Sequence, residues 1–413
     1  MFNVIFARRG VFLSKIYHTA IVGGGAAGLI AAVDLLRGKN CILGSDVLIL
    51  EGNDRVGKKL IATGNGQGNL TNANVTVDNY YGDKKFISDF IENLNKINLK
   101  NYLEDIGIPL SSGKDGKMYP LSKQASSVLD IIRLNLLSKG VNEVTSAKVT
   151  AIKKANKNYK LITSGGEFFA KNVIVAVGGA AAKQFGTDGT SYSILEDLGH
   201  RRTKIYPSLV QLKTESNLIR GLKGLKETAK VTAIYKGKPI KSAVGDLLFT
   251  EFGVSGSAVF SVSAAVTGLD GVKLKIEFVP ELEKEEIERI LICREKLGYI
   301  KREDALVGIV NKRVGQAVIK SAKDLTAKGV ADALKNFTLS VTGNLGFNYA
   351  QVTKGGIKTD EVYSNTFESK LYDDLYIVGE VLDVDGDCGG YNLTFAFVSG
   401  ILSARAIKEK GRE

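Results

Sequence analysis

Three glycines in a six-residue pattern give the first indication of chemistry in this sequence. The stretch IVGGGAAGLIAAVDLLRG contains GxGxxG at Gly23, Gly25 and Gly28. In dinucleotide-binding sites the first glycine permits a tight turn, the second admits a pyrophosphate, and the third lets a helix pack closely on a strand. The phosphates then lie on free N–H groups at the start of the helix, here at Ala26 and Ala27. The pattern predicts a dinucleotide site.

An acidic residue follows at the distance where such sites bind a ribose. Glu51 ends the apolar stretch VLILE, 23 residues after Gly28. A carboxylate at this place accepts hydrogen bonds from ribose hydroxyls, and it repels the 2′-phosphate of NADP. The sequence therefore favours FAD or NAD as the nucleotide of this site.

Two later segments return to the same ligand and favour FAD. VIVAVGG ends at Gly178 and Gly179, and LYIVGE ends at Gly379 and Glu380. A helix then begins at 390–392, and a helix N-terminus aimed at the pyrimidine edge of a flavin stabilises the negative charge of the reduced ring. No second GxGxxG occurs in the sequence, so NADH or NADPH, as electron donor, must dock without a Rossmann domain of its own.

These residues need a parallel sheet to bring them together. Apolar runs predict buried strands at 16–22 and 46–50 and at the end of 143–177. Helical patterns lie at 26–37, 84–106, 123–139 and 392–409. The sequence thus predicts an α/β fold with an interrupted nucleotide-binding domain.

The interruption is visible as a change of pattern near residue 190. Residues 205–280 alternate apolar and polar in short runs, which indicates a β-rich unit, and 281–338 read as helices. We therefore expect an FAD-binding domain in two parts, 1–190 and 345–413, around an inserted substrate domain at 191–344.

Composition excludes several other classes of protein. Cys41, Cys293 and Cys388 are odd in number and far apart, without a CxxC pair, which argues against a disulfide framework and a zinc site and fits a reducing cytoplasm. We expect no metal. The longest uncharged run, 19–33, is too short and glycine-rich to span a bilayer. Residues 1–15 read as an extended or misassigned start, because no small-residue cleavage site follows them.

The positive charge is concentrated in one segment. The net charge is +12, and residues 200–245 hold 11 Lys and Arg against 2 acids. The simple interpretation is a solvated basic face. The alternative is a surface for an anionic partner, RNA above all, since phosphate contacts dominate such binding.

The chain resembles a bacterial family of single-chain FAD-dependent oxidoreductases, the aminoacetone oxidase-like or BaiN-like flavoproteins, which include ribosomal RNA dihydrouridine synthases. The resemblance runs from about residue 17 to 406 and rests on these motifs: IVGGGAAGL, GKKLIATGNGQGNLTN, VGGAAAKQFGTDGTSY, GDLLFTEFGVSGSAVF, AQVTKGGI and ESKLYDDLYIVGEVLDVDGDCGGYN. It implies a Rossmann-type, glutathione reductase-like three-layer FAD domain with an inserted domain of β-barrel and helices.

The resemblance also places the uncharged stretch TGNGQGNLTN, residues 63–72, against the flavin, where side chains would block close backbone approach. The family usually reads Gly-Arg-Cys-Asn where this chain has Gly66, Gln67, Gly68 and Asn69. A charged donor and a thiol beside the reactive ring are therefore missing. Any activity that needs that thiol as a proton donor requires another group here.

The residues expected to contact the cofactor come from all of these segments. They are Gly23, Gly25, Ala26, Ala27, Gly28, Glu51, Gly52, Asn53, Lys58, Lys59, Thr63, Gly64, Asn69, Val149, Gly178, Gly179, Gly379, Glu380, Asp383, Gly390, Tyr391, Asn392 and Leu393.

The resemblance implies three substrate classes: oxidation of small amino-ketones with release of hydrogen peroxide, reduction of a C=C in steroid-like enones, and reduction of uracil in ribosomal RNA. The flavin supplies hydride transfer in each of them. Reduction of uracil also needs a general acid within about 3 Å. Cys388, Tyr391 and Asp383 are the candidates, although Cys388 suits a small filler better and Asp383, with Glu380, suits hydrogen bonding to the ribityl chain.

Histidine and serine are poor alternatives as catalytic groups. His18 lies in the first strand and reads as structural, whereas His200 reads as surface or helix-terminal. SGSAVF, residues 255–260, does not meet GxSxG and reads as close packing at the domain junction.

The basic segment then decides the order of the hypotheses. Our leading hypothesis is a reductase of uracil in ribosomal RNA, because RNA benefits from a basic face and a steroid or amino-ketone does not. The alternatives are an amine oxidase of the aminoacetone-oxidising kind and a non-catalytic, FAD-bound RNA-binding protein.

Overall fold

A seven-stranded sheet forms the centre of the larger unit. The computed structural model describes residues 15–215 and 217–411. The sheet has the order β7-β2-β1-β10-β9-β8, and β19 pairs with the C-terminal half of β10. Its strands are β1 (Ile16–Val22), β2 (Val47–Leu50), β7 (Asn142–Val144), β8 (Val149–Ala155), β9 (Asn158–Thr163), β10 (Gly166–Val175) and β19 (Leu375–Ile377).

The centre of this sheet is parallel and buried. β1 pairs in parallel with β2 and β10, while β8, β9 and β10 are joined by antiparallel pairs. All four residues of β2 are buried, as expected for a parallel strand covered on both faces. The predicted α/β class with a Rossmann-type sheet is confirmed.

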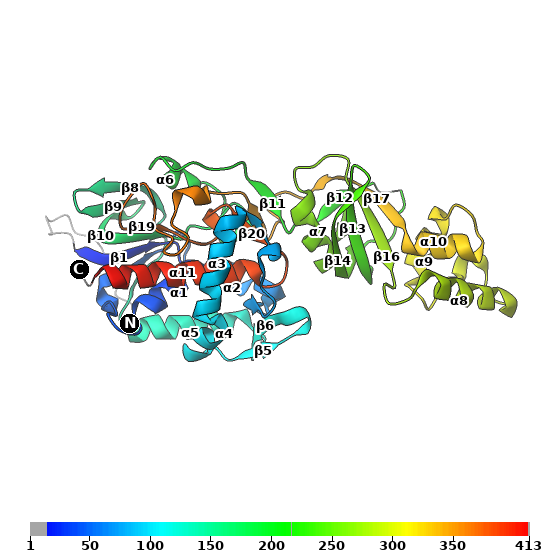
Figure 1. The fold of residues 1–413 in the computed structure, drawn as a ribbon, viewed down its shortest axis with the longest axis horizontal. Coiled ribbons are helices and arrows are strands. Elements are labelled where there is room, and N and C mark those ends of the chain that lie inside the picture. The colour runs from blue at the N-terminus through cyan, green and yellow to red at the C-terminus, as the bar shows by residue number, and fades with distance from the viewer. Residues whose placement is uncertain (1–14, 216, 412–413) are drawn as a thin grey trace.

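Helices cover the sheet, and the first and last of the described helices lie side by side. α11 (Tyr391–Lys410) lies along α1 (Ala26–Leu35) (Figure 1). A Cβ on Gly400 would lie 2.4 Å from the Ala27 carbonyl oxygen, so this glycine lets the two helices approach closely. The remaining helices of this unit are α2 (Lys58–Ile61), α3 (Lys84–Ile97), α4 (Leu99–Asp105), α5 (Ala125–Ser138) and α6 (Tyr192–Glu196).

One expected helix is divided. The predicted helix at 84–106 breaks into α3 and α4 at Asn98, whose φ is +47°. Asparagine tolerates this left-handed conformation, and its side chain accepts a hydrogen bond from the Asn101 N–H at the start of α4.

The inserted segment contains a closed antiparallel barrel, confirming that part of the predicted fold. Its order is β12-β15-β14-β13-β16-β17, and β12 pairs with both β15 and β17 to close it. The strands are β12 (Leu212–Thr214), β13 (Lys226–Tyr235), β14 (Lys238–Phe249), β15 (Gly253–Ser255), β16 (Lys273–Phe278) and β17 (Phe337–Asn344). Buried Phe249, Phe278 and Phe337 contribute to its core.

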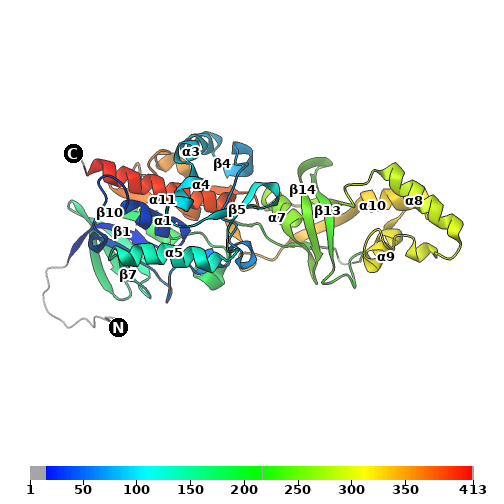
Figure 2. The same ribbon diagram turned by 90° about the horizontal axis from the view of Figure 1, so that it is seen from below.

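Helices lie on both sides of this barrel. α7 (Ser257–Val266) interrupts the stretch expected to be β-rich. α8 (Lys284–Leu297), α9 (Lys312–Ser321) and α10 (Ala327–Lys335) form the far end of the elongated molecule (Figures 1 and 2). The domain boundaries near residues 190 and 345 stay predictions.

Short strand pairs lie near the junction of the two units, and the first of them connects the inserted segment to the larger unit. β11 (Tyr206–Ser208) pairs with β18 (Val352–Lys354), and β4 (Tyr80–Gly82) pairs with β20 (Val384–Gly386). β3 (Thr71–Asn72), β6 (Lys117–Pro120) and β5 (Leu110–Ser112) form a further small sheet. The prediction for the start of the chain concerns residues outside the described part, apart from Lys15. None of the described helices combines the length and apolar composition that a bilayer crossing requires.

Candidate cofactor and active site

The glycine-rich turn between β1 and α1 has the shape that a pyrophosphate needs. A Cβ on Gly28 would lie 2.1 Å from the Gly23 carbonyl oxygen, whereas a Cβ on Gly25 would meet no atom within 4 Å. Gly28 therefore permits close packing, and Gly25 leaves open space before the helix. No side chain caps α1 and no acid lies in its first turn, so its N–H groups are suited to an anion.

Glu51 is fixed at the edge of this turn. Its Oε2 accepts a hydrogen bond from the Gly24 N–H at 2.8 Å, and its Oε1 accepts from the backbone N–H and side-chain amide of Asn53 at 2.7 and 2.8 Å. The Ala147 N–H donates to the Glu51 carbonyl oxygen, two residues before Val149 begins β8. The structure thus brings Glu51 and Asn53 together and packs Gly52 against Lys148, the residue before Val149.

A second group of residues lies where the ends of β10 and β19 meet. The Lys59 ammonium is 2.6 Å from Glu380 Oε2, and Glu380 Oε1 accepts from the Thr353 N–H at 2.9 Å. Thr353 Oγ1 accepts in turn from the Ala180 and Ala181 N–H groups at 2.8 and 3.0 Å. This network connects α2, β18 and the turns after β10 and β19. Thr353 was not predicted, although it lies in the motif AQVTKGGI.

The two adjacent lysines do not act together. Lys58 pairs with the exposed Asp54, four residues earlier, so only Lys59 reaches Glu380. The hydroxyl of Thr63 donates to the Leu60 carbonyl oxygen at 2.7 Å, which engages it in a local turn.

The start of α11 packs closely against the glycine-rich stretch 63–72, since a Cβ on Gly390 would lie 2.5 Å from the Thr71 carbonyl oxygen. Gly390 has φ +97° and no side chain caps the helix. The Asn392 side chain instead holds the backbone of Gly386, accepting from its N–H and donating to its carbonyl oxygen, both at 2.8 Å. Tyr391 is buried, with Leu393 partly buried behind it. The predicted contacts at 390–393 thus depend on backbone groups.

The glycine-rich stretch at 63–69 is shaped partly by its own packing. A Cβ on Gly64 would lie 2.9 Å from the Asn69 nitrogen. Gly68 has φ +74°, and its Cβ would meet the Cα of Ala125 at 3.1 Å and Pro120 at 3.3 Å. A side chain at position 68 would therefore point towards the start of α5 in this chain. A thiol at this position would not lie where the family resemblance places it, beside the flavin ring.

Three aspartates line the loop before α11. Burial raises the pKa of Asp383, and it raises the pKa of Asp385 to about 7. Asp385 is 1% exposed and lies 3.0 Å from the Ser208 hydroxyl. Asp387 accepts from the Tyr81 hydroxyl and the Lys241 ammonium, both at 3.0 Å.

The other two candidate acids have different surroundings. Cys388 packs beside Leu209 and Val352, and burial raises its pKa, as expected for a filler. Burial also raises the pKa of Tyr391, and its carbonyl oxygen accepts from the Tyr80 hydroxyl. Their assignment as acids stays a prediction.

Tyr192 lies close to the same site and was not predicted. It is 1% exposed, and within the described residues its hydroxyl has no hydrogen-bond partner. Burial raises its pKa, and the negative charge of Glu380 contributes further. A buried hydroxyl without a partner beside Glu380 fits a site completed by a bound cofactor. Tyr192 ends the motif GTDGTSY, which the family resemblance already included, and this motif could have identified it as a site residue.

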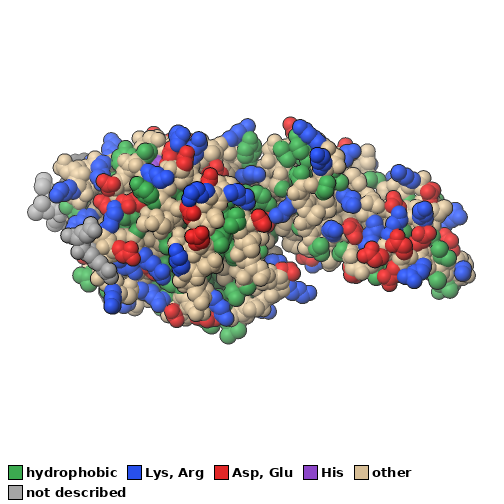
Figure 3. All heavy atoms as spheres, in the orientation of Figure 1, with side chains coloured by type: hydrophobic (Ala, Val, Ile, Leu, Met, Phe, Trp, Pro, Cys, Tyr) green, Lys and Arg blue, Asp and Glu red, His purple; other side chains and the backbone are tan. Residues whose placement is uncertain are grey.

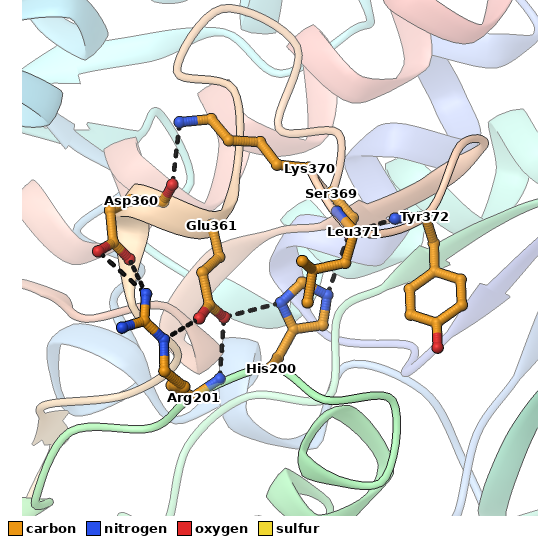
Figure 4. A network of polar contacts seen from close by, with 8 residues as sticks. All are labelled: His200, Arg201, Asp360, Glu361, Ser369, Lys370, Leu371 and Tyr372. Atoms are coloured by element: carbon orange, nitrogen blue, oxygen red, sulfur yellow. Dashed lines mark hydrogen bonds and ion pairs between the residues drawn. The ribbon is translucent and has the colours of Figure 1, made fainter.

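The prediction of a surface position for His200 is wrong, whereas the helix-terminal alternative agrees with the structure, because the His200 N–H donates to the Leu195 carbonyl oxygen at the end of α6. Figure 4 shows the His200 ring between Glu361 and Ser369, with Nδ1 and Nε2 each 3.0 Å from an oxygen. The side chain is fully buried, and Ser369 Oγ also accepts from the Leu371 and Tyr372 N–H groups. Glu361, His200 and Ser369 are connected in the same order as the residues of a nucleophilic triad. Because the His200 side chain is fully buried, no substrate can reach it, and the three residues instead hold distant segments together.

The remaining predictions about histidine and serine agree with the structure. His18 lies in β1, with Nδ1 2.9 Å from the Thr19 hydroxyl. Residues 255–260 pass from β15 into α7, and a Cβ on Gly256 would lie 2.2 Å from the Asp246 carbonyl oxygen. The small residues there serve close packing.

Sequence comparison with known proteins gives independent support for a nucleotide-binding oxidoreductase. The family described as HI0933-like protein Rossmann domain matches residues 17–406. A 3-dehydro-bile acid delta(4,6)-reductase from Clostridium scindens is 33% identical over 407 residues, covering 94% of this chain and 98% of that protein. A ribosomal RNA dihydrouridine synthase from Haemophilus influenzae is 26% identical over 415 residues, covering 96% and 100%.

Solved structures share the fold. A 3-ketosteroid-delta4-(5alpha)-dehydrogenase from Rhodococcus jostii superposes with a TM-score of 0.50 at 14% identity, covering 98% of this chain and 100% of that one. The FrdA chain of E. coli quinol fumarate reductase gives 0.50 at 15% identity, covering 96% and 71%. The chain belongs to the HI0933-like Rossmann family and is an FAD-dependent oxidoreductase.

Proposed function

We propose that the protein reduces a carbon–carbon double bond conjugated to a carbonyl group, with NADH or NADPH as electron donor. The observation that carries this proposal is the cluster of acids Asp383, Asp385 and Cys388, whose pKa values are raised by burial, in the segment that leads into the N-terminus of α11. Reduction of an activated double bond needs a hydride and a proton on neighbouring carbons. Both relatives have names that denote such a reduction.

Each part of the site then has a defined task. Bound FAD supplies hydride transfer at N5. Glu51 would accept hydrogen bonds from the ribose, and the N–H groups that follow Gly25 would hold the pyrophosphate. The N-terminus of α11 would stabilise negative charge on the reduced ring, and the Lys59–Glu380 pair joins α2 to the turn after β19.

A small enone is the first choice of substrate. The relative with 33% identity is named for a bile acid. The basic segment also gives less support to RNA than its composition indicates, because six of its 11 cations pair with carboxylates. On the face drawn in Figure 3, basic and acidic side chains are interspersed. Surface pairs of this kind neutralise charge that a nucleic acid would otherwise meet.

Uracil in ribosomal RNA is the second candidate, favoured by the dihydrouridine synthases at 26% and 24% identity. Uracil has the same conjugated arrangement as an enone, so the chemistry at the flavin would be shared. The five remaining cations of the basic segment, among them exposed Arg220, Lys236 and Lys238, would contact the phosphates.

The test is anaerobic mixing of the FAD-loaded protein with NADH or NADPH, recorded as loss of flavin absorbance, followed by a 4-ene-3-ketosteroid or by unmodified ribosomal RNA. Bleaching by the nicotinamide and recovery of colour with one substrate support reduction and identify its class. Bleaching by aminoacetone with peroxide release on admission of oxygen would instead select the oxidase. A flavin that neither donor bleaches would select a non-catalytic protein.

A further inference from the structure

We propose that Tyr81 is the proton donor of this reduction, and that Asp387 and Lys241 position it. The inference rests on the proposed function and names a residue of the same site. Tyr81 lies in β4 of the larger unit, Asp387 follows β20, and Lys241 comes from β14 of the barrel. The three residues therefore meet only where the two units are docked.

The geometry joins the three groups directly. The Tyr81 hydroxyl donates to Asp387 Oδ1 at 3.0 Å, and the Lys241 ammonium donates to Asp387 Oδ2 at 3.0 Å. The Asp387 carboxylate thus has one oxygen for each partner. Its backbone is fixed as well, because its N–H donates to the Asn79 carbonyl oxygen in the segment before β4. A proton donor must be held in one orientation, and this arrangement holds the phenol.

Both cations and carboxylates surround the ring of Tyr81. The Lys241 and Lys354 ammonium groups lie 5.6 and 5.4 Å from the centre of the Tyr81 ring. Burial, together with Asp387 and Asp385, holds the pKa of Tyr81 above its usual value, so the hydroxyl keeps its proton until a strongly basic carbon forms. The two ammonium groups then offset the negative charge of the phenolate and of Asp387.

The location also suits a substrate group. Tyr81 is only partly buried, and it packs at the junction with Leu209, Phe260 and Cys388. Cys388 is two residues before Gly390, the N-cap of α11. Ligand sites occur preferentially at such junctions between units, lined by apolar groups with a few polar ones.

The neighbouring acids are less suitable. Asp385 lies opposite Tyr81 in the β4–β20 pair, but it is almost fully enclosed and directed to Ser208. Cys388 has apolar neighbours. Burial raises the pKa of Asp383, and Lys354 and Lys358 offset only part of that shift, but no charged group holds its carboxyl in one orientation by a hydrogen bond among the contacts described. Tyr81 is the one of these groups with both partial exposure and a charged hydrogen-bonded partner.

The step balances as a two-electron reduction. NADH or NADPH gives two electrons and a proton as hydride, which reach one alkene carbon through the cofactor. The O–H bond of Tyr81 breaks, and its proton forms the new C–H bond at the neighbouring carbon while the π bond is lost. Water then returns a proton to the phenolate.

The experiment compares the two half-reactions in Tyr81→Phe, with Tyr363→Phe, an exposed tyrosine, as matched control. The reduced protein is mixed anaerobically with a 4-ene-3-ketosteroid or with unmodified ribosomal RNA, and flavin reoxidation is recorded. Tyr81→Phe slows reoxidation by roughly 100-fold or more, within the usual contribution of a general acid. The rate of flavin reduction by NADH in Tyr81→Phe stays within about twofold of the wild-type rate, since the proton donor takes no part in this half-reaction.

Lys241→Met tests the positioning role without altering the phenol. It lowers kcat with little change in KM, and Lys241→Arg restores part of the loss, whereas Lys273→Met, at the exposed start of β16 in the same barrel, has no effect. These variants also serve if Tyr81→Phe does not fold.

Reoxidation of Tyr81→Phe at the wild-type rate overturns the inference and leaves the proposed function intact. A loss seen instead in Asp385→Asn or Cys388→Ala transfers the role to that residue and overturns it too. A wild-type protein reoxidised by neither substrate overturns both proposals.

Discussion

The carboxylate of Glu380 and the ammonium of Lys59 lie 2.6 Å apart although 321 positions separate them in the chain. The pair joins α2, the helix after β2, to the turn after β19. It therefore fixes the two halves of the nucleotide-binding unit around one ligand.

Removing either partner weakens FAD binding more than it weakens the fold. Lys59→Met leaves Glu380 without its cation, and Glu380→Gln leaves Lys59 without its anion. A double-mutant cycle on the FAD dissociation constant gives a coupling energy of about 1 kcal/mol, because both side chains are largely buried and hydrogen-bonded. Additive effects in the cycle would mean that the two residues act independently. Lys58→Met, whose partner Asp54 is exposed, is the control.

Alanine substitution has different effects at two glycines of the first turn: one variant loses FAD affinity and the other loses stability. Gly25→Ala leaves the stability of the FAD-free protein unchanged, because its φ of −85° suits any residue and its Cβ meets no atom. It nevertheless lowers FAD affinity at least about tenfold, since the methyl group occupies the pyrophosphate approach.

Gly28→Ala destabilises the fold itself, because its Cβ would lie 2.1 Å from the Gly23 carbonyl oxygen. We expect a loss of about 1 to 3 kcal/mol in the free energy of unfolding. Thermal unfolding of both variants without FAD, and FAD titration by fluorescence, measure the contrast. Equal stability of the two variants would disagree with these separate roles.

The glycine roles could be predicted from sequence because they depend on neighbours a few residues away. Glu51 could be predicted because a strand end places it beside the glycine turn. The Asp387–Lys241 pair could not, since 146 positions and two structural units separate its members. The burial of His200 was missed for a related reason: Glu361 and Ser369, which enclose it, come from a distant segment.

The missing family thiol cannot be restored by substitution. Gly68→Cys forces a side chain onto a backbone with φ +74° and against Ala125, which costs about 1 kcal/mol or more in stability. The thiol would point to the start of α5, so we expect no gain in flavin reoxidation. An increase in rate after this substitution would show that the loop rearranges around the ring. Gln67→Arg, at an exposed position, is a control that leaves the backbone unstrained.

The buried Asp385 gives the fold a specific pH dependence. Its pKa is about 7 in the folded protein and near 3.9 when unfolded. Both states are protonated below pH 4, so this carboxyl contributes no difference there. Between pH 4 and 7 only the unfolded state has lost the proton, and stability falls by up to about 1.4 kcal/mol per pH unit.

Asp385→Asn removes this titration. Its stability relative to the wild type therefore rises from pH 4 to pH 7 and is constant above that, as measured by urea unfolding at each pH. Asp270→Asn, at an exposed position, shows no such trend. A constant difference between Asp385→Asn and wild type across the range would contradict a raised pKa.

The FAD content of the folded protein shows whether the segments around Gly25, Glu51 and Glu380 form a flavin site. Released flavin, measured by absorbance against chain concentration after incubation with FAD and removal of the excess, should give one FAD per wild-type chain and little for Gly25→Ala. A folded wild-type protein that stays colourless after this treatment would contradict the account.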